Sequence, residues 1–498
     1  MKPVIVWLRQ DLRLADHRPL TAAAESGAPV VPCYVLDEGS SRSGASGDRG
    51  LGDWGLGGAS KWWLHESLAA MMRDLDAIGS RLVLRRGASV DVLRALVKET
   101  GAGEVVTTAA YEPRATALET RVHDALKADG VPMRRLAGAT LKRPDALRTK
   151  AGQPFKVYTP FWRALIASEP PPLPQPAPKA LKPLAAWPKS DDLASWALLP
   201  TKPDWSGGMA AVWTPGEAGA SARLDAFLAS ALPDYDDQRN RPDLPGTSRL
   251  SPHIHHGETS VATCWHRARA AADRFASKGI KADKGLETFL KELVWRDFAV
   301  HLLVHWPTLP DAPFKPEFAN FPWRENAAGL RAWQRGQTGY PIVDAGMREL
   351  WHNGWMHNRV RMITASFLVK DLLLPWQVGE AWFWDTLVDA DLASNAASWQ
   401  WVAGCGADAA PYFRIFNPVS QGQKFDPDGA YVRHWVPELA KLPTAHIHEP
   451  WTAPPMVLAA AGVTLGKSYP KPIVDHKLAR NDALAALKTI SRGAAAAE

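Results

Sequence analysis

The sequence predicts an α/β domain with a parallel sheet at the N-terminus and a larger, all-helical domain after it. Short apolar runs rich in β-branched residues alternate with longer helix-like stretches over the first 135 or so residues. This alternation is typical of βαβ units on a parallel sheet. The runs lie at residues 4–8, 30–36, 82–84 and 104–107, with helix-like stretches such as 61–77 between them. From about residue 220 the periodicity is helical and few strand candidates remain.

The boundaries of these parts follow from a shift in composition. Residues 170–188 are rich in proline, which disfavours both a helix and a central strand. We therefore expect an extended connector there. We expect an α/β domain over 1–135, a linker over 136–220, a helical domain over 221–480 and a C-terminal tail over 481–498, whose last residues, "GAAAAE", are expected to fray. The helical segments are expected near 222–231, 284–306, 341–374 and 380–402. No G-x-G-x-x-G follows the first strand, so the usual dinucleotide fingerprint is absent there.

Composition limits the class of protein. Of the 498 residues, 46% are hydrophobic and 22% are charged, which is an ordinary balance for a globular protein. No run of eighteen apolar residues is present and the three cysteines are scattered, so we expect a cytoplasmic chain with no membrane segment. The 58 basic and 52 acidic residues give a net charge of +6, which permits a polyanionic partner without demanding one. Nothing in the sequence requires more than a monomer.

The stretch "GTSRLSPHIHHG" at 246–257 is a candidate phosphate site. Ser251-Pro252 resembles the N-cap and first turn of a helix, whose free amides bind anions. An ordinary helix cap explains the stretch equally well. The three histidines, His253, His255 and His256, lack the i, i+4 spacing of metal ligands, so packing or solvated side chains are the better interpretation.

Three helical stretches carry polar or aromatic residues where core residues would be expected. In 285–303, Glu292, Trp295 and Arg296 lie opposite an apolar face; Glu292 and Arg296 fit a surface ion pair, and Trp295 beside a carboxylate fits a base-stacking platform. In 354–367, one face holds Asn358, Arg361 and Met362, with Arg359 beside them. In 387–401, Asp391, Asn395 and Trp399 recur at i, i+4, i+8, although Asp391 could instead be an N-cap. Small residues and then Arg414, a candidate phosphate contact, follow.

Taken together, these motifs resemble the photolyase/cryptochrome family, and most closely the microbial cyclobutane pyrimidine dimer photolyases. The strings that carry the resemblance are, in order, "VIVWLRQDLRLADHRPL", "TSRLSP", "ELVWRDF", "WQRGQTGYPIVDAGMREL", "GWMHNRVRMITASFLVKDLL", "DLASNAASWQWVAGCGADAAPYFRIFNP" and "GQKFD". The resemblance covers nearly the whole chain. The resemblance implies an N-terminal antenna-type α/β domain, a helical FAD domain, and light-driven repair of ultraviolet-damaged DNA.

The resemblance also implies roles for individual residues. Those matching the FAD phosphate site are Tyr235, Thr247, Ser248, Arg249, Leu250 and Ser251; those around the isoalloxazine and ribose are Arg296, Asn358, Arg361, Asp389, Asp391 and Asn395. Arg361 and Asp389 are expected to form an ion pair over the ring, and Asn395 to lie near flavin N5. The lesion pocket is matched by Glu292, Trp295, Met362 and Trp401, with Asn358 beside it, and the DNA backbone contacts by Arg239, Arg359 and Arg414. Trp399, Trp376 and Trp323 match the chain of tryptophans that carries electrons to the excited flavin.

Some questions stay open at this point. Glu112 matches a position that contacts a folate antenna in some members, but its surroundings do not decide between folate, deazaflavin and no antenna. The paired histidines that mark the six-four branch are not seen in "GWMHNRVRM". A cryptochrome-type photoreceptor is the alternative function, and the intact lesion-pocket residues favour repair. A dark flavin oxidoreductase would need a nicotinamide or small-substrate site that the sequence does not show.

Overall fold

The computed structural model describes residues 1–37, 54–408 and 413–495, with side chains as far as residue 490. The chain divides by its internal contacts into two compact units. The first holds residues 1–233, 248–307 and 388–393, and the second holds 234–247, 308–387 and 394–498. These limits differ from the predicted domain boundaries, which stay a prediction. Each unit is described by itself below.

The first unit contains the predicted parallel sheet. Five strands, all parallel, lie in the order β3-β2-β1-β4-β5. They are β1 (Val4–Leu8), β2 (Val30–Leu36), β3 (Val83–Arg86), β4 (Glu104–Thr108) and β5 (Met133–Leu136). The predicted fold class is therefore confirmed. The sequence missed β5 because Arg134 and Arg135 interrupt its apolar pattern, which an edge strand tolerates.

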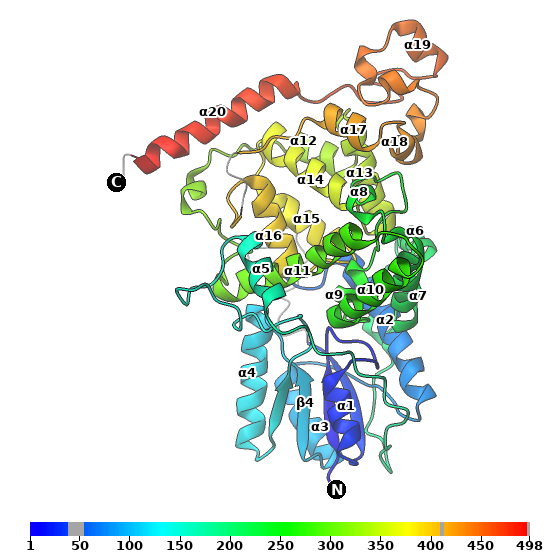
Figure 1. Cartoon of the computed structure of the whole chain (residues 1–498), viewed down its shortest axis with the longest axis vertical. Helices are drawn as coiled ribbons and strands as arrows, with labels where there is room; N and C mark the ends of the chain where they lie inside the picture. The colour runs from blue at the N-terminus through cyan, green and yellow to red at the C-terminus, as the bar shows by residue number, and fades with distance from the viewer. Residues whose placement is uncertain (38–53, 409–412, 496–498) are drawn as a thin grey trace. The chain divides into compact units, whose positions relative to one another are not determined.

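Helices cover both faces of this sheet (Figure 1). In β1, Val4, Val6 and Leu8 point into one core cluster, which α1 (Arg18–Glu25) and α2 (Gly58–Ala77) close. Ile5 and Trp7 point into the other cluster, with α3 (Ser89–Thr100) and α4 (Pro113–Ala128). Because both faces are buried, the central strands read as continuous apolar runs without alternation.

Strand order reverses between β1 and β4. The chain leaves β1 toward β2 and β3 on one side, then crosses to β4 and β5 on the other. The loops at the carboxyl ends of β1 and β4 therefore diverge and leave a crevice, which is where open parallel sheets bind ligands.

The rest of the first unit is helical apart from its connector. Its elements are α5 (Tyr158–Ala167), the short 3-10 helix η1 (Leu193–Trp196), α6 (Gly207–Val212), α7 (Glu217–Ala226), the π-helical η2 (Phe227–Ala231), α9 (Ser251–His255), α10 (Val261–Ala276) and α11 (Asp283–His305). As predicted, residues 170–188 form no helix or strand. The connector is nevertheless fixed, because Leu181 lies in the core and the Lys182 carbonyl accepts a hydrogen bond from Val30.

The second unit is all-helical in the residues described. Its longer elements are α12 (Ala327–Gln334), α13 (Pro341–Asn353), α14 (Asn358–Ser366), the π-helical η4 (Phe367–Asp371), α15 (Trp376–Thr386), most of α16 (Leu392–Ala403), α17 (Pro418–Phe425) and α20 (His476–Ala495). Shorter ones are α8 (Tyr235–Gln238), η3 (Pro316–Asn320), α18 (Ala430–Trp435), η5 (Pro437–Leu439), η6 (Thr444–His446), η7 (Pro450–Thr452) and α19 (Pro455–Ala460).

Two predictions about these helices need correction. The segment expected over 341–374 is interrupted at Gly354, which adopts a left-handed conformation at the end of α13. The segment expected over 380–402 is interrupted between α15 and α16. Within the expected C-terminal tail, helix α20 continues as far as Ala495, and small and apolar residues on one side of it are buried. Within the described part of the chain, the helices lack the length and apolar character needed to cross a membrane.

Candidate functional site

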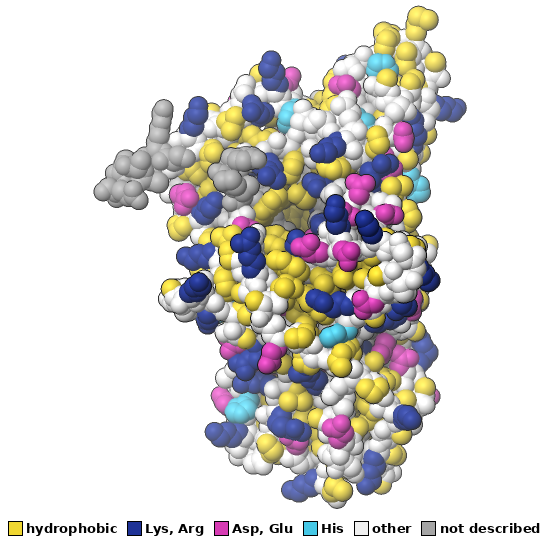
Figure 2. Space-filling view, viewed as in Figure 1, with side chains coloured by type: hydrophobic (Ala, Val, Ile, Leu, Met, Phe, Trp, Pro, Cys, Tyr) yellow, Lys and Arg dark blue, Asp and Glu magenta, His cyan; other side chains and the backbone are white. Residues whose placement is uncertain are grey.

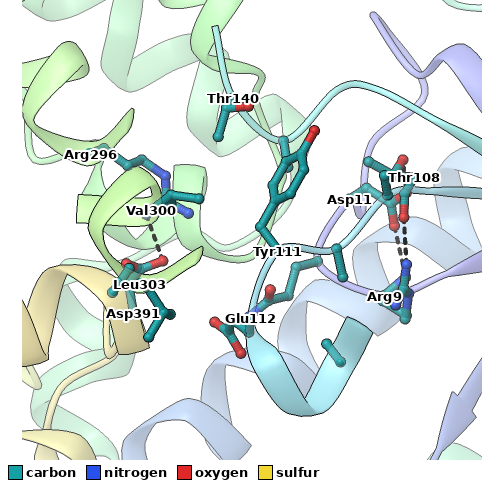
Figure 3. Close-up of a pocket in the computed structure, with 16 residues that line it drawn as sticks. Arg9, Asp11, Thr108, Tyr111, Glu112, Thr140, Arg296, Val300, Leu303 and Asp391 are labelled. Atoms are coloured by element: carbon teal, nitrogen blue, oxygen red, sulfur yellow. Dashed lines mark hydrogen bonds and ion pairs between the residues drawn. The ribbon is translucent and has the colours of Figure 1, made fainter. Parts of the chain in front are cut away.

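A cavity of about 190 Å³ lies in the crevice where the strand order reverses. Its walls come from the loop after β1, the loop after β4, and α11 (Figure 3). Tyr111 and Glu112 project into the middle, between an acid–base cluster on the β1 side and a second one on the α11 side. The sequence signal that could have located it is the polar run Arg9-Gln10-Asp11 directly after β1, since two alanines follow β4.

The cluster on the β1 side is rigid. Thr108 donates a hydrogen bond to Asp11 at 2.5 Å, and Arg9 donates to the Thr108 carbonyl and to Glu119. His17 lies 3.0 Å from Asp11. Burial alone would raise the pKa of Asp11, but its interactions with His17 and its hydrogen bonds outweigh burial and lower it. Asp11 is therefore a fixed anion in this wall.

The cluster on the α11 side joins three residues that the sequence singled out. The Arg296 guanidinium forms an ion pair with Asp391 at 2.9 Å, and His255 lies 3.7 Å from the same carboxylate. Burial, and then the charge of Asp391, raises the pKa of Glu112 to about 7. Glu112 thus changes its charge near neutral pH, beside a permanent ion pair.

Two local expectations are corrected here. Asp391 directly precedes α16 instead of lying on its face with Asn395 and Trp399, which favours the capping position that was the alternative. Helix α9 begins at Ser251 with Leu250 as its N-cap, one residue earlier than expected. The nearby histidines His253 and His256 are buried and pack against Trp63, which agrees with the packing interpretation.

The residues expected to hold FAD belong to both units. Ser248, Arg249, Leu250, Ser251, Arg296, Asp389 and Asp391 belong to the first, and Tyr235, Thr247, Asn358, Arg361 and Asn395 to the second. The side chains fit a flavin nucleotide in their chemistry. The Nε of Arg296 is buried and has no hydrogen-bond partner among the described residues, so it can donate to a ligand oxygen. Asn395 donates its amide to the Glu380 carbonyl at 3.1 Å, which fixes the side chain and turns Oδ1 to the other side as an acceptor.

The three arginines expected to contact DNA do lie close together in the second unit. Burial, and then the charges of Arg239 and Arg414, lowers the pKa of Arg359. Each guanidinium also lies over an aromatic ring: Arg239 over Tyr235, Arg359 over Phe425 and Arg414 over Trp401, with distances of 5.8, 4.4 and 5.8 Å. Elsewhere the basic and acidic side chains are interspersed over the visible face (Figure 2). The arginine cluster is therefore a local concentration of positive charge.

The expected lesion-pocket and electron-transfer residues differ in exposure. Glu292, Trp295, Met362 and Trp401 are half-buried, so part of each can meet a ligand. Trp399 and Trp376 are each 2% exposed, whereas Trp323 is half-buried. Trp399 is packed edge-on against Phe383 with 4.9 Å between ring centroids. This gradient suits a path from the protein surface to the interior, and the path itself stays a prediction.

Sequence reasoning missed an aromatic groove in the second unit. Its cavity of about 310 Å³ is lined mostly by tryptophans and arginines; the lining residues are Gln334, Arg335, Met347, Arg348, Trp351, His352, Trp382 and Trp435. Trp351 and Trp382 are nearly parallel, with an interplanar angle of 9° and 6.0 Å between centroids. Trp351 is 57% exposed, which is unusual for an indole. The residues come from separate helices, so no single motif could have revealed the groove.

Comparison with known proteins agrees with this architecture. Residues 4–179 match the family model described as DNA photolyase, and residues 289–489 match the FAD binding domain of DNA photolyase. A deoxyribodipyrimidine photo-lyase of Agrobacterium fabrum is 51% identical over 490 residues, covering 98% of both chains. Cryptochrome-1 of Arabidopsis thaliana is 38% identical over 94% of this chain and 68% of its own length.

Solved structures show the same relationship. The crystal structure of a bacterial class III photolyase from Agrobacterium tumefaciens superposes with a TM-score of 0.92 at 50% identity, covering 99% of this chain and 98% of that one. The matched family models and the near full-length relatives together account for both parts of the fold. The chain belongs to the DNA photolyase family.

Proposed function

We propose that this protein is a light-driven DNA repair enzyme that splits cyclobutane pyrimidine dimers. The observation that carries the proposal is the arginine cluster of the second unit, in which Arg239, Arg359 and Arg414 each lie beside an aromatic ring. Closely spaced cations bind the phosphate backbone, and aromatic faces take up unstacked bases. The 51%-identical photo-lyase, whose name specifies dipyrimidine sites, supports the same substrate.

The chain's own residues would bind, orient and shield the lesion. The three arginines position the backbone without reading sequence, because phosphate contacts carry no base information. Moving the dimer out of the duplex costs a few kcal/mol, and less at a damaged site. Trp295 and Trp401 would stack on the extruded pyrimidines, and Glu292 would hydrogen-bond to them. The dimer would thereby be withdrawn from water.

The expected flavin-binding residues would orient the cofactor. Arg296 has a buried N–H to donate, and Asn395 has a fixed amide oxygen to accept. Bound FAD supplies a light-excited electron donor, which is chemistry that no side chain offers. Trp399, Trp376 and Trp323 would hold a path along which electrons pass inward to the flavin site from an external reductant at the protein surface.

The direct test is repair in the light. Pre-reduced protein is mixed with an oligonucleotide that carries one thymine dimer, and thymine recovery under near-ultraviolet light is compared with a dark control by chromatography. We expect recovery only in the light. Recovery in neither condition, with flavin bound and DNA affinity intact, would favour the photoreceptor alternative that the cryptochrome relative represents.

We further propose that the groove at Trp351 and Trp382 binds an antenna chromophore of the folate type. A ligand of that size needs a pocket of about 300–1,000 Å³, a range that the groove reaches with about 310 Å³ and the Glu112 cavity, at about 190 Å³, does not. The parallel indoles suit a flat ring system, and the exposed Arg335 suits its carboxylates. The antenna role of Glu112 stays the competing prediction.

Retention of added methenyltetrahydrofolate distinguishes the two places. Trp351→Ala is expected to lose the near-ultraviolet absorbance of bound folate, and Glu112→Gln to keep it. Loss in Glu112→Gln alone would locate the antenna at the strand crevice. Full retention in both variants would contradict both assignments.

A further inference from the structure

The inner side of the Trp295 indole is occupied by another aromatic ring. Tyr158, the first residue of α5, lies flat against it, with 3.7 Å between ring centroids and 5° between ring planes. Tyr158 is 7% exposed, and Trp295 stays half-buried. The two residues are far apart in sequence, so only the fold of the first unit brings them together.

Tyr158 is itself held at several points along α11. Its hydroxyl donates a hydrogen bond to the Lys291 carbonyl at 2.7 Å, one turn before Trp295. Its ring meets Phe298 edge-on at 5.8 Å, and Phe298 meets Trp295 edge-on at the same distance. Residues 291, 295 and 298 form one stripe along the helix. The Tyr158 ring is therefore held at its hydroxyl by the Lys291 carbonyl and at its edge by Phe298. It stays in place even if the Trp295 indole rotates.

This arrangement restricts what Trp295 can bind and how. Because Tyr158 covers one face of the indole, Trp295 can stack on a planar ligand only with its other face. The same helix, α11, carries Glu292 about one turn before Trp295. An indole that is already fixed loses little freedom on binding, which improves affinity without adding a contact to the ligand.

We propose that Tyr158 is a positioning residue that holds Trp295 as a preformed stacking platform for the extruded pyrimidine pair. The inference rests on the proposed function and deepens it. Tyr158 acts through Trp295 and does not touch the substrate.

The test uses dark binding, which does not depend on photochemistry. Dissociation constants are measured for an oligonucleotide with one thymine dimer and for its undamaged counterpart, at one salt concentration. The ratio of the two constants is the preference for damage. Tyr158→Leu should lower this ratio by roughly three- to tenfold, the range expected for losing one aromatic pair. Tyr158→Phe, which keeps the ring, should retain most of the preference.

Phe161→Leu is the matched control. Phe161 lies one turn further along α5, is 2% exposed, and packs on Phe298 and His301 with 5.2 and 5.1 Å between centroids. It should lower the melting temperature much as Tyr158→Leu does and leave the damage preference unchanged. An equal loss of preference in Phe161→Leu would overturn the proposal in favour of a purely structural role.

A double-mutant cycle tests whether Tyr158 changes the damage preference through Trp295. In a Trp295→Leu background, Tyr158→Leu should cost no further preference, because the platform is already gone. A full additional loss there would show that Tyr158 acts independently of Trp295, which contradicts the proposal. If the unmodified protein binds damaged and undamaged DNA equally, the proposed function itself fails before any variant is compared.

Discussion

Arg359 is the residue where the competing demands of the proposed DNA interface are clearest. It is half-buried, donates to Asn240 at 2.6 Å, and lies near two other cations. Like charges held close together repel one another, and a phosphate oxygen relieves this cost. Three cations retained in one place therefore indicate an anionic partner more strongly than the net charge of +6 does.

Arg359→Ala is expected to weaken binding of damaged and undamaged DNA by the same factor. One phosphate contact is lost, so the slope of log affinity against log salt should fall by about 1. Affinity is measured by fluorescence anisotropy between about 50 and 200 mM salt. Arg331→Ala, an exposed arginine on α12, is the control and should leave the slope unchanged. A selective loss for damaged DNA would show that Arg359 reads the lesion instead of the backbone.

At this scale, residue type and spacing singled out Arg359 and Arg414, whereas Arg239 came only from the family resemblance. Arg414 stands between aromatic residues in the sequence, and Arg359 stands beside the polar face of Asn358 and Arg361, so both could be named before their surroundings were known. The partner of Arg296 could not, because Asp391 comes from a segment 95 positions further along the chain. Tyr158 carried no signal, since nothing in its local sequence indicates the indole that it covers.

Among the elements, α15 and α16 are in unusually close contact at Gly379. A Cβ added there would lie 2.1 Å from Cη2 of Trp399 and 2.6 Å from Cδ2 of Leu368. Glycine inside a helix ordinarily costs about 1 kcal/mol relative to alanine. Its presence in α15 is explained by the indole that it admits, and it sets how closely the helix carrying Trp376 approaches Trp399.

Gly379→Ala is therefore expected to destabilise the protein, against the usual preference for alanine. Overpacking costs typically 1–3 kcal/mol, which exceeds the helix-propensity gain. Denaturant unfolding should show a loss of about 1–2 kcal/mol. Light-driven reduction of oxidised flavin should also slow, because the expected electron path runs through Trp399, while repair by pre-reduced protein persists. Gly207→Ala, where no atom lies within 4 Å, is the control. Unchanged stability in Gly379→Ala would contradict the close packing of Trp399 on Gly379.

The elements that the sequence predicted well are those with one strong pattern. β1 and β2 were predicted to the residue because their apolar runs are buried on both faces. The breaks at Gly354 and before α16 were missed because helical periodicity continues across them. A left-handed residue interrupts a helix without disturbing its pattern of apolar residues.

Over the whole molecule, buried carboxyl groups and a buried histidine change the free energy of unfolding with pH in opposite directions. Burial raises the pKa of Glu112 and of Asp297 to about 7, and raises those of Asp371 and Asp426 to about 6. These carboxyl groups release their protons at a higher pH in the folded state than in the unfolded chain. Their contribution to stability is therefore lost as pH rises from about 4 to about 7. Burial lowers the pKa of His301 to about 4, so that group adds stability as pH rises from about 4 to 6.5.

Comparing one variant with the unmodified protein isolates a single acid. In the unfolded chain Glu112 ionises near 4.5, so its contribution falls as pH rises from about 4.5 to about 7 and is constant above. Glu112→Gln should remove that decline, so its unfolding free energy relative to the unmodified protein should increase from pH 5 to pH 7. Denaturant midpoints at pH 5, 6, 7 and 8 measure the difference. A difference that does not vary with pH would exclude a raised pKa.

Helix α16 has a consequence for how such a protein evolves. Trp399 and Trp401 are two positions apart, hence about 200° apart around the helix axis, with the first buried and the second half-buried. Substitutions on the side of α16 that carries Trp401 leave the packing around Trp399 intact. On the proposed roles, a descendant lineage can abandon DNA repair and keep light-driven electron uptake by changing one face of one helix. Selection can therefore act on the two activities separately, although they share a single element.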